Sequence, residues 1–147
     1  MLSMLKRIRS ERGNAMIETA ITLPILLLVS VSIFEFGRAY QTWEVLTNAA
    51  REGARIAVLD GTSDDDIRSR VNQYLGVGGL TAPPDGNITI DHTVPFTGDP
   101  TGPKGSLVQI SYPFDFMVLN PVAKLVVSGS TLGGPITMHA SALMRNE

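Results

Sequence analysis

Glu18 is the residue whose type and position most need a chemical explanation. It stands directly before sixteen uncharged residues, 19–34. A carboxylate at the centre of a membrane helix costs roughly 3 kcal/mol, so an acid in this place needs a partner. A cut between Gly13 and Asn14 would create an α-amino group about one helical turn from Glu18. The Glu18 carboxylate of one subunit could then pair with the amino group of a neighbour and fix their axial register. The alternative interpretation is a solvated glutamate at the level of the lipid headgroups.

The other chemically capable residues indicate neither catalysis nor metal binding. His92 and His139 fall on expected strands, with no carboxylate partner at a recurrent metal-ligand spacing. Residues 64–66 are three aspartates, but the spaced ligands of a calcium loop are missing. The chain has no cysteine, which excludes disulfides, thiolate metal sites and cysteine nucleophiles. We therefore expect no enzymatic activity, no cofactor and no metal.

Charge is distributed unevenly along the chain. Residues 1–13 hold four basic side chains against one acid, whereas the remainder is mildly acidic and has no basic stripe. This distribution argues against nucleic-acid binding. The length of 147 residues suits one domain together with a membrane segment.

Residues 14–34 have the composition of a transmembrane segment. A spanning helix needs roughly 20 predominantly apolar residues, and the run reaches that length when Glu18 is included. The basic residues before it place the N-terminus in the cytoplasm by the positive-inside rule. Pro24 lies inside the run and should kink the helix. A cleaved secretory signal would need a small-x-small site after its apolar core, where this chain has Ile33-Phe34-Glu35-Phe36.

Four sequence strings in order resemble one known family. They are GNAMIE (residues 13–18), LP (23–24), EFGRA (35–39) and NAAREGAR (48–55). Gly13 with Glu18 as the fifth residue after it looks like a type IV prepilin leader and cleavage site. Together the strings resemble the TadE-like pseudopilins, minor pilin-like proteins of the tight-adherence (Flp) pilus machinery. The resemblance covers residues 12–59 and returns more weakly near 112–114 and 144–147.

This resemblance implies roles for individual residues and for partners. Arg12 and Gly13 would form the leader side of a prepilin peptidase site, and Asn14 the mature N-terminus. Glu18 would be the acid for register and recruitment. The implied partners are the peptidase, the major Flp-type pilin, other pseudopilins, and the inner-membrane assembly platform with its ATPase. The chain would be a single-pass inner-membrane protein with its C-terminal domain outside the cytoplasm.

Residues 35–59 are expected to continue the helix as an amphipathic spine. Apolar or small residues recur every three or four positions, which predicts one buried face: Phe36, Ala39, Tyr40, Trp43, Leu46, Ala50, Gly53 and Ala57. Tyr40 and Trp43 would also suit the membrane–water interface. We assign spine and packing roles to Glu35, Arg38, Tyr40, Trp43, Ala50, Arg51, Glu52, Gly53 and Arg55.

Two ion pairs are expected on this spine, because Glu35 and Arg38, and Glu52 and Arg55, stand three residues apart. The small residues near Gly53 should allow close packing, in the first place against the domain's own sheet. Asp60-Gly61 is the expected stop, with the glycine in the left-handed cap conformation.

The C-terminal part is expected to form a small antiparallel sheet and one short helix. Ser63 should cap a helix over 64–75, and alternating patterns predict strands near 87–94, 106–114 and 136–144. Residues 120–127 are compatible with a helix or a strand. The fold class is therefore α+β, with a leader at 1–13, a membrane segment at 14–34 and an extracytoplasmic domain at 35–147.

A second functional interpretation stays open beside the pilin-like one. The chain could be a permanently anchored extracytoplasmic binding or scaffolding module that keeps its leader. The mass of the mature N-terminus distinguishes the two, because only processing would make Asn14 the first residue.

Overall fold

The computed structural model describes residues 2–97 and 99–146, with the side chains of residues 2–12 and of Val126 outside the description. The chain divides into two compact units. We call Met1–Gly37 with Asp115–Gly134 the N-terminal unit. We call Arg38–Phe114 with Pro135–Glu147 the sheet unit. Each unit is described by itself.

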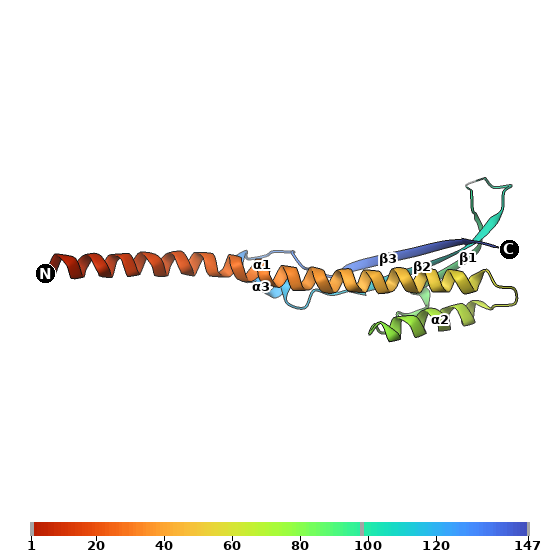
Figure 1. The fold of residues 1–147 in the computed structure, drawn as a ribbon, viewed down its shortest axis with the longest axis horizontal. Coiled ribbons are helices and arrows are strands. Elements are labelled where there is room, and N and C mark those ends of the chain that lie inside the picture. The colour runs from red at the N-terminus through yellow and green to blue at the C-terminus, as the bar shows by residue number, and fades with distance from the viewer. Residues whose placement is uncertain (1, 98, 147) are drawn as a thin grey trace. The chain divides into compact units, whose positions relative to one another are not determined.

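The secondary structure confirms the expected α+β fold. The elements are α1 (Leu2–Ala57), α2 (Asp64–Val77), the single 3₁₀ turn η1 (Asp85–Asn87), β1 (Ile88–Pro95), β2 (Lys104–Phe114), α3 (Leu119–Val126) and β3 (Ile136–Arg145). The strands form one sheet in the order β1-β2-β3, and both pairings are antiparallel (Figure 1). Residues 120–127, compatible with either state in the sequence, fall almost entirely within a helix.

α1 ends two residues before the predicted boundary. The helix stops at Ala57, and Leu59 donates its backbone N–H to the Ile56 carbonyl over 3.0 Å in the turn that follows. Gly61 has a φ of +81°, which side chains with a Cβ rarely adopt, so the glycine marks the reversal as expected. The backbone of α1 is also helical through most of the basic N-terminal stretch, from Leu2 onward.

The predicted buried face of α1 is confirmed at Ala39, Leu46, Ala50, Gly53 and Ala57, and it is wrong at three aromatic positions. The buried positions recur every three or four residues and are mostly small or polar: Glu35, Ala39, Thr42, Leu46, Ala49, Ala50, Gly53, Ala54 and Ala57. The prediction was wrong for Phe36, Tyr40 and Trp43, which are exposed, Tyr40 by 60%. The Tyr40 and Trp43 rings lie near each other, with centroids 6.2 Å apart. The apolar spacing gave the wrong result at these positions because it assigns large apolar residues to the core and polar residues such as Glu35 and Thr42 to the surface.

α2 begins at a more complete cap than the sequence indicated. Ser63 Oγ accepts the Asp66 backbone N–H over 3.2 Å, and Asp66 Oδ2 accepts the Ser63 N–H over 3.2 Å. This reciprocal capping box satisfies backbone donors that the helix itself leaves unpaired. The helix then buries Ile67, Val71 and Leu75, which recur every four residues.

One irregularity interrupts the pairing of β1 with β2. Asp91 lies opposite Leu107 but Val94 lies opposite Gly105, so β1 has one extra residue between them. Such a bulge bends the strand and changes the direction of its side chains. His92 lies in this bulge.

Gly53 is a point of close approach in the core of the sheet unit. A Cβ atom at Gly53 would lie 2.7 Å from Val71 Cγ2 on α2 and 3.2 Å from Val108 Cγ1 on β2. Both valines are fully buried. The small residues of α1 thus allow the helix to pack against α2 and the sheet at once.

Gly53→Ala is expected to destabilise the protein by about 1–3 kcal/mol, because the added methyl group overpacks a filled core. The matched control is Gly76→Ala in α2, where a Cβ meets nothing within 4 Å. Loss of glycine flexibility should make that variant about 0.5–1 kcal/mol more stable. Thermal unfolding of the full chain in detergent measures both. Equal stability of the two variants would contradict the packing argument.

Candidate functional site

The residues predicted for processing and register lie on one exposed stretch of α1. Gly13, Asn14 and Glu18 are all exposed, and the helix runs through them without a break. Thr22 Oγ1 donates to the Glu18 carbonyl over 2.9 Å, so this hydroxyl is satisfied within the helix. Arg12, the other residue of the predicted cleavage site, has its side chain outside the described residues.

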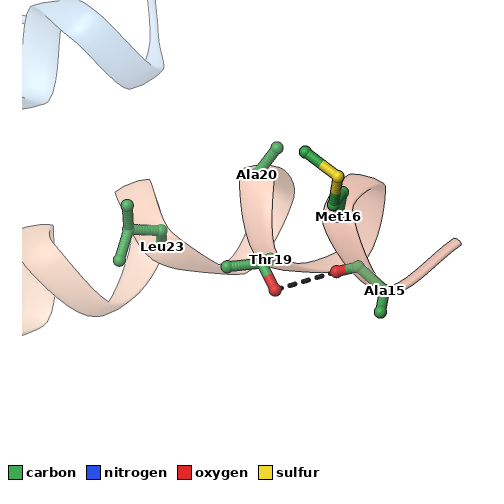
Figure 2. Close-up of a pocket in the computed structure, with 5 residues that line it drawn as sticks. All are labelled: Ala15, Met16, Thr19, Ala20 and Leu23. Atoms are coloured by element: carbon green, nitrogen blue, oxygen red, sulfur yellow. Dashed lines mark hydrogen bonds between the residues drawn. The ribbon is translucent and has the colours of Figure 1, made fainter. Parts of the chain in front are cut away.

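A shallow hollow opens on this stretch between successive turns. Figure 2 shows its lining, which is mostly small or apolar: Ala15, Met16, Thr19, Ala20 and Leu23. Thr19 Oγ1 donates to the Ala15 carbonyl over 2.8 Å. The hydroxyl is therefore turned back onto its own helix, and the hollow presents a predominantly apolar surface.

The apolar run that follows has the length and composition of a membrane span. Among the described residues, the helical stretch Gly13–Ala57 is both long enough and apolar enough to cross a bilayer. No residue of its most apolar 18-residue window is buried. Ser30 Oγ donates to the Leu26 carbonyl and Ser32 Oγ to the Leu28 carbonyl, over 2.8 and 2.7 Å. These bonds satisfy the hydroxyls without water, as an apolar surrounding requires.

Pro24 lies inside this run, and α1 continues through it. A proline has no backbone N–H, so one carbonyl a turn earlier loses its helical partner. Pro24 also lines an apolar pocket of the N-terminal unit, together with Leu23, Leu27, and Val122 and Leu125 of α3. The kink itself stays a prediction.

Glu35 has a structural role that the sequence did not reveal. Its side chain is only 6% exposed, and its carboxylate accepts the backbone N–H groups of Met117 and Val118 over 3.3 and 3.2 Å. The Phe36 and Phe116 rings meet edge to face beside it, with centroids 5.9 Å apart. Glu35 thereby holds the residues just before α3 against α1. The partners lie more than 80 residues away, so no local spacing could have indicated them.

The family comparison matches the same part of the chain. Residues 13–55 fit the family model described as TadE-like protein. The chain is TadE-like over these residues. No curated protein and no solved structure matches it. This match covers less than a third of the chain.

The matched region ends in a cluster of charges around Glu52. Its Oε2 accepts from Arg55 Nε over 2.9 Å, which confirms the expected pair, and its Oε1 accepts from Arg70 Nη2 of α2 over 2.8 Å. Hydrogen bonds from Arg55 and then from Arg70 lower the pKa of Glu52 to about 2, against partial desolvation. Glu52 thus joins α1 to α2 beyond the membrane segment.

The remaining spine residues have separate contacts. Arg51 Nη1 donates to Asn48 Oδ1 over 3.3 Å, and Ala50 is fully buried. Arg38 places its guanidinium 4.5 Å from the centre of the Phe114 ring, a cation–π contact. The pairing of Glu35 with Arg38 stays a prediction.

His92 belongs to a polar network that links α1, α2, β1 and β2. The Nε2 atom of His92 lies 3.0 Å from Asp64 Oδ1, and its Nδ1 atom lies 2.9 Å from Ser106 Oγ. The Ser106 hydroxyl also lies 3.2 Å from the Ala57 carbonyl oxygen. Asn146 closes the network, with Oδ1 2.7 Å from Ser106 Oγ and Nδ2 3.1 Å from the His92 carbonyl.

Asp64, His92 and Ser106 are the residue types of a hydrolytic triad, but Nε2 faces the aspartate and Nδ1 the serine, the reverse of a triad. Ser106 is also fully buried, so no substrate could approach its hydroxyl in this conformation. The network joins α1, α2 and the strands. Sequence reasoning missed it because Asp64 and His92 are distant in the chain. Among the described residues no three His, Cys, Asp or Glu side chains gather as metal ligands.

Glu35→Ala should leave the Met117 and Val118 amides, which now donate hydrogen bonds to the Glu35 carboxylate, without that acceptor. Losing the acceptor of a buried N–H costs about 1–3 kcal/mol, so we expect exchange at Met117 and Val118 to be about tenfold faster or more. Hydrogen exchange of the full chain in detergent, read by mass spectrometry, measures this. Glu44→Ala, which removes an exposed acid from the same helix, is the control. Unchanged exchange at both amides would contradict the assigned role.

Glu52→Gln should lower the stability of the sheet unit in a pH-dependent way. Because the folded pKa of about 2 lies below the ordinary value of 4.5, the ion pairs stabilise the fold fully above pH 4.5. We expect the variant to be about 1–2 kcal/mol less stable at pH 7, after allowing for solvent screening of the two arginines.

That difference should shrink as pH falls from 4.5 towards 2, because the wild-type carboxylate then becomes protonated. Denaturant unfolding at several pH values measures it, with Asp60→Asn as the exposed-acid control. A difference that is constant between pH 7 and pH 2 would rule out the ion pairs as its source.

Proposed function

We propose that this TadE-like chain is a structural subunit that a prepilin peptidase processes after Gly13 and that Tad pilus assembly requires. The observation that carries this proposal is the position of Gly13, Asn14 and Glu18 on one exposed stretch of α1, within the family match. The new α-amino group on Asn14 would stand four residues before Glu18, about 6 Å along a helix. Glu18 is then within reach of an amino group presented by an adjacent subunit.

The proposed role of Glu18 follows from the energetics of a charge in an apolar place. An unpaired carboxylate there costs roughly 3 kcal/mol, and a neighbour's amino group offsets that cost only at one axial offset. The pair would therefore select both a partner and a register. The apolar hollow beside Glu18, lined by Ala15, Thr19 and Ala20, gives a second helix room to approach closely.

The proposed topology places the basic residues of 1–13 in the cytoplasm and the sheet unit outside. The peptidase would act at the cytoplasmic membrane surface. The major Flp-type pilin, other pseudopilins, and the assembly platform with its ATPase are the proposed partners during assembly.

One observation supports the second candidate, an uncleaved anchored module. α1 begins at Leu2 and passes through the proposed scissile bond, and a peptide bond inside a helix must unwind before a peptidase can cut it. Gly13 favours local unwinding, because glycine inside a helix is about 0.5–1 kcal/mol less favourable than alanine. We therefore favour processing.

Two measurements on one variant test the proposal. Glu18→Ala, expressed with the cognate peptidase, should insert into the membrane and still have Asn14 as its first residue by intact mass. Piliation should fall by about 100-fold, the effect of losing a partnered charge of roughly 3 kcal/mol from an assembly equilibrium. The matched control is Glu44→Ala, which removes an exposed acid elsewhere on the same helix and should assemble normally. Normal piliation of Glu18→Ala would overturn the role of this acid, and a wild-type chain starting at Met1 would favour the anchored module.

A further inference from the structure

Residues 115–134 are unusually apolar for a segment that connects strands. They hold only two charged residues, Asp115 and Lys124. They belong to the same compact unit as the first part of α1. Large apolar side chains nevertheless project outward from them: Met117, Val118, Leu125, Val127 and Leu132 are exposed, Leu125 by 82%.

Contacts at its two ends fix the position of α3 along α1. At the start, the Met117 and Val118 amides bond to Glu35. Towards its end, Val122 and Leu125 line a pocket with Leu23, Pro24 and Leu27. Glu35 lies about 12–18 Å further along α1 than Leu23–Leu27, and the eight residues of α3 extend for about 12 Å. α3 therefore runs antiparallel to α1, from the end of the apolar run 19–34 to its middle.

Several polar backbone groups around α3 are bonded within the segment. The Val127 N–H donates to the Ala123 carbonyl over 2.9 Å, and the Gly134 N–H to the Thr131 carbonyl over 3.1 Å. The Leu132 N–H donates to Ser130 Oγ over 3.2 Å, and Asn120 Nδ2 donates to the Leu132 carbonyl over 3.1 Å. Non-helical backbone is tolerated at membrane depth only where protein buries it or it lines a water-filled cavity, so residues 127–132 need α1 and these bonds to cover their polar groups.

From these observations we propose that residues 117–132 form a re-entrant segment, whose α3 lies in the hydrocarbon of the leaflet nearest Glu35 with its exposed apolar side chains against lipid. The inference rests on the membrane insertion of residues 14–34 given under the proposed function. If those residues span the bilayer, α3 lies beside the half of the span nearest Glu35, with its last turn near the middle, and is surrounded by acyl chains. Lys124 is exposed, and its long side chain can extend its ammonium group towards the headgroups.

Lipid is favoured over a second protein chain because the exposed apolar surface is continuous with that of the span. Leu26 on α1 is 62% exposed. It lies at the same level along α1 as Leu23 and Leu27, which line the pocket shared with α3. A bilayer covers side chains in every direction around both helices, whereas a single partner helix would cover one face. Each such side chain left in water would cost about 1.5–3 kcal/mol.

Spin labels on single cysteines test this directly, because the natural chain has no cysteine. Three variants of the full chain are reconstituted alone in phosphatidylcholine vesicles: Leu125→Cys in α3, Leu26→Cys in the span, and Val77→Cys at the end of α2. Val77 is 87% exposed and is the matched control for an exposed apolar residue outside the membrane. Collisions of each label with oxygen, which concentrates in lipid, are compared with those of a water-soluble nickel chelate.

The Leu125 label should resemble the Leu26 label, with high oxygen accessibility and a loss of nickel accessibility relative to Val77. A Leu125 label that nickel reaches as readily as Val77 would overturn the re-entrant segment. A Leu125 label shielded from both reagents at high protein density, and reached by nickel on dilution with lipid, would mean that another copy covers α3, which also overturns it. Water exposure of the Leu26 label would instead refute the membrane span, so the two failures are distinguishable.

Discussion

The cost of removing a carboxylate from water shapes this protein at three places along α1. Glu52 is partly buried and is paired with two arginines. Glu35 is almost fully buried and accepts two backbone amides. Glu18 is exposed on an apolar stretch. The first two acids are satisfied within the chain and organise its fold. For Glu18 a partner from outside the chain is the corresponding solution, which is why its proposed role is in assembly.

The two internal acids also show how one helix can serve two different surroundings. In the sheet unit, α1 buries small residues, and Gly53 brings Val71 and Val108 close to its backbone. Removal of apolar surface from water stabilises that packing. The arginines around Glu52 remain solvated at the edge of the core. In the N-terminal unit the large residues point outward and hydroxyls bond back to their own helix. These are the opposite requirements of a water-soluble core and of a lipid-facing helix.

Features that depend on neighbouring residues could be predicted from the sequence. The apolar run, the Ser63 cap, the strands and the Glu52–Arg55 pair all follow from patterns within a few positions. Features that depend on distant residues could not. Glu35 bonds to Met117, and His92 reaches Asp64 because a bulge redirects it. The face of α1 was misjudged at Tyr40 for a related reason: polar Glu35 and Thr42 occupy buried positions that apolar counting gives to aromatic residues.

The proposed lipid contact of α3 constrains what the subunit can do during assembly. A chain drawn out of the bilayer loses the acyl chains around Leu125, Val127 and Leu132, at about 1.5–3 kcal/mol for each side chain left in water. A subunit within a filament must therefore cover this surface with its neighbours, as it must cover the apolar stretch beside Glu18. A subunit that stays in the membrane has no such requirement. If α3 lies in lipid, a subunit that stays in the membrane can support assembly from there without covering this surface. A subunit that enters the filament needs neighbouring subunits to cover it.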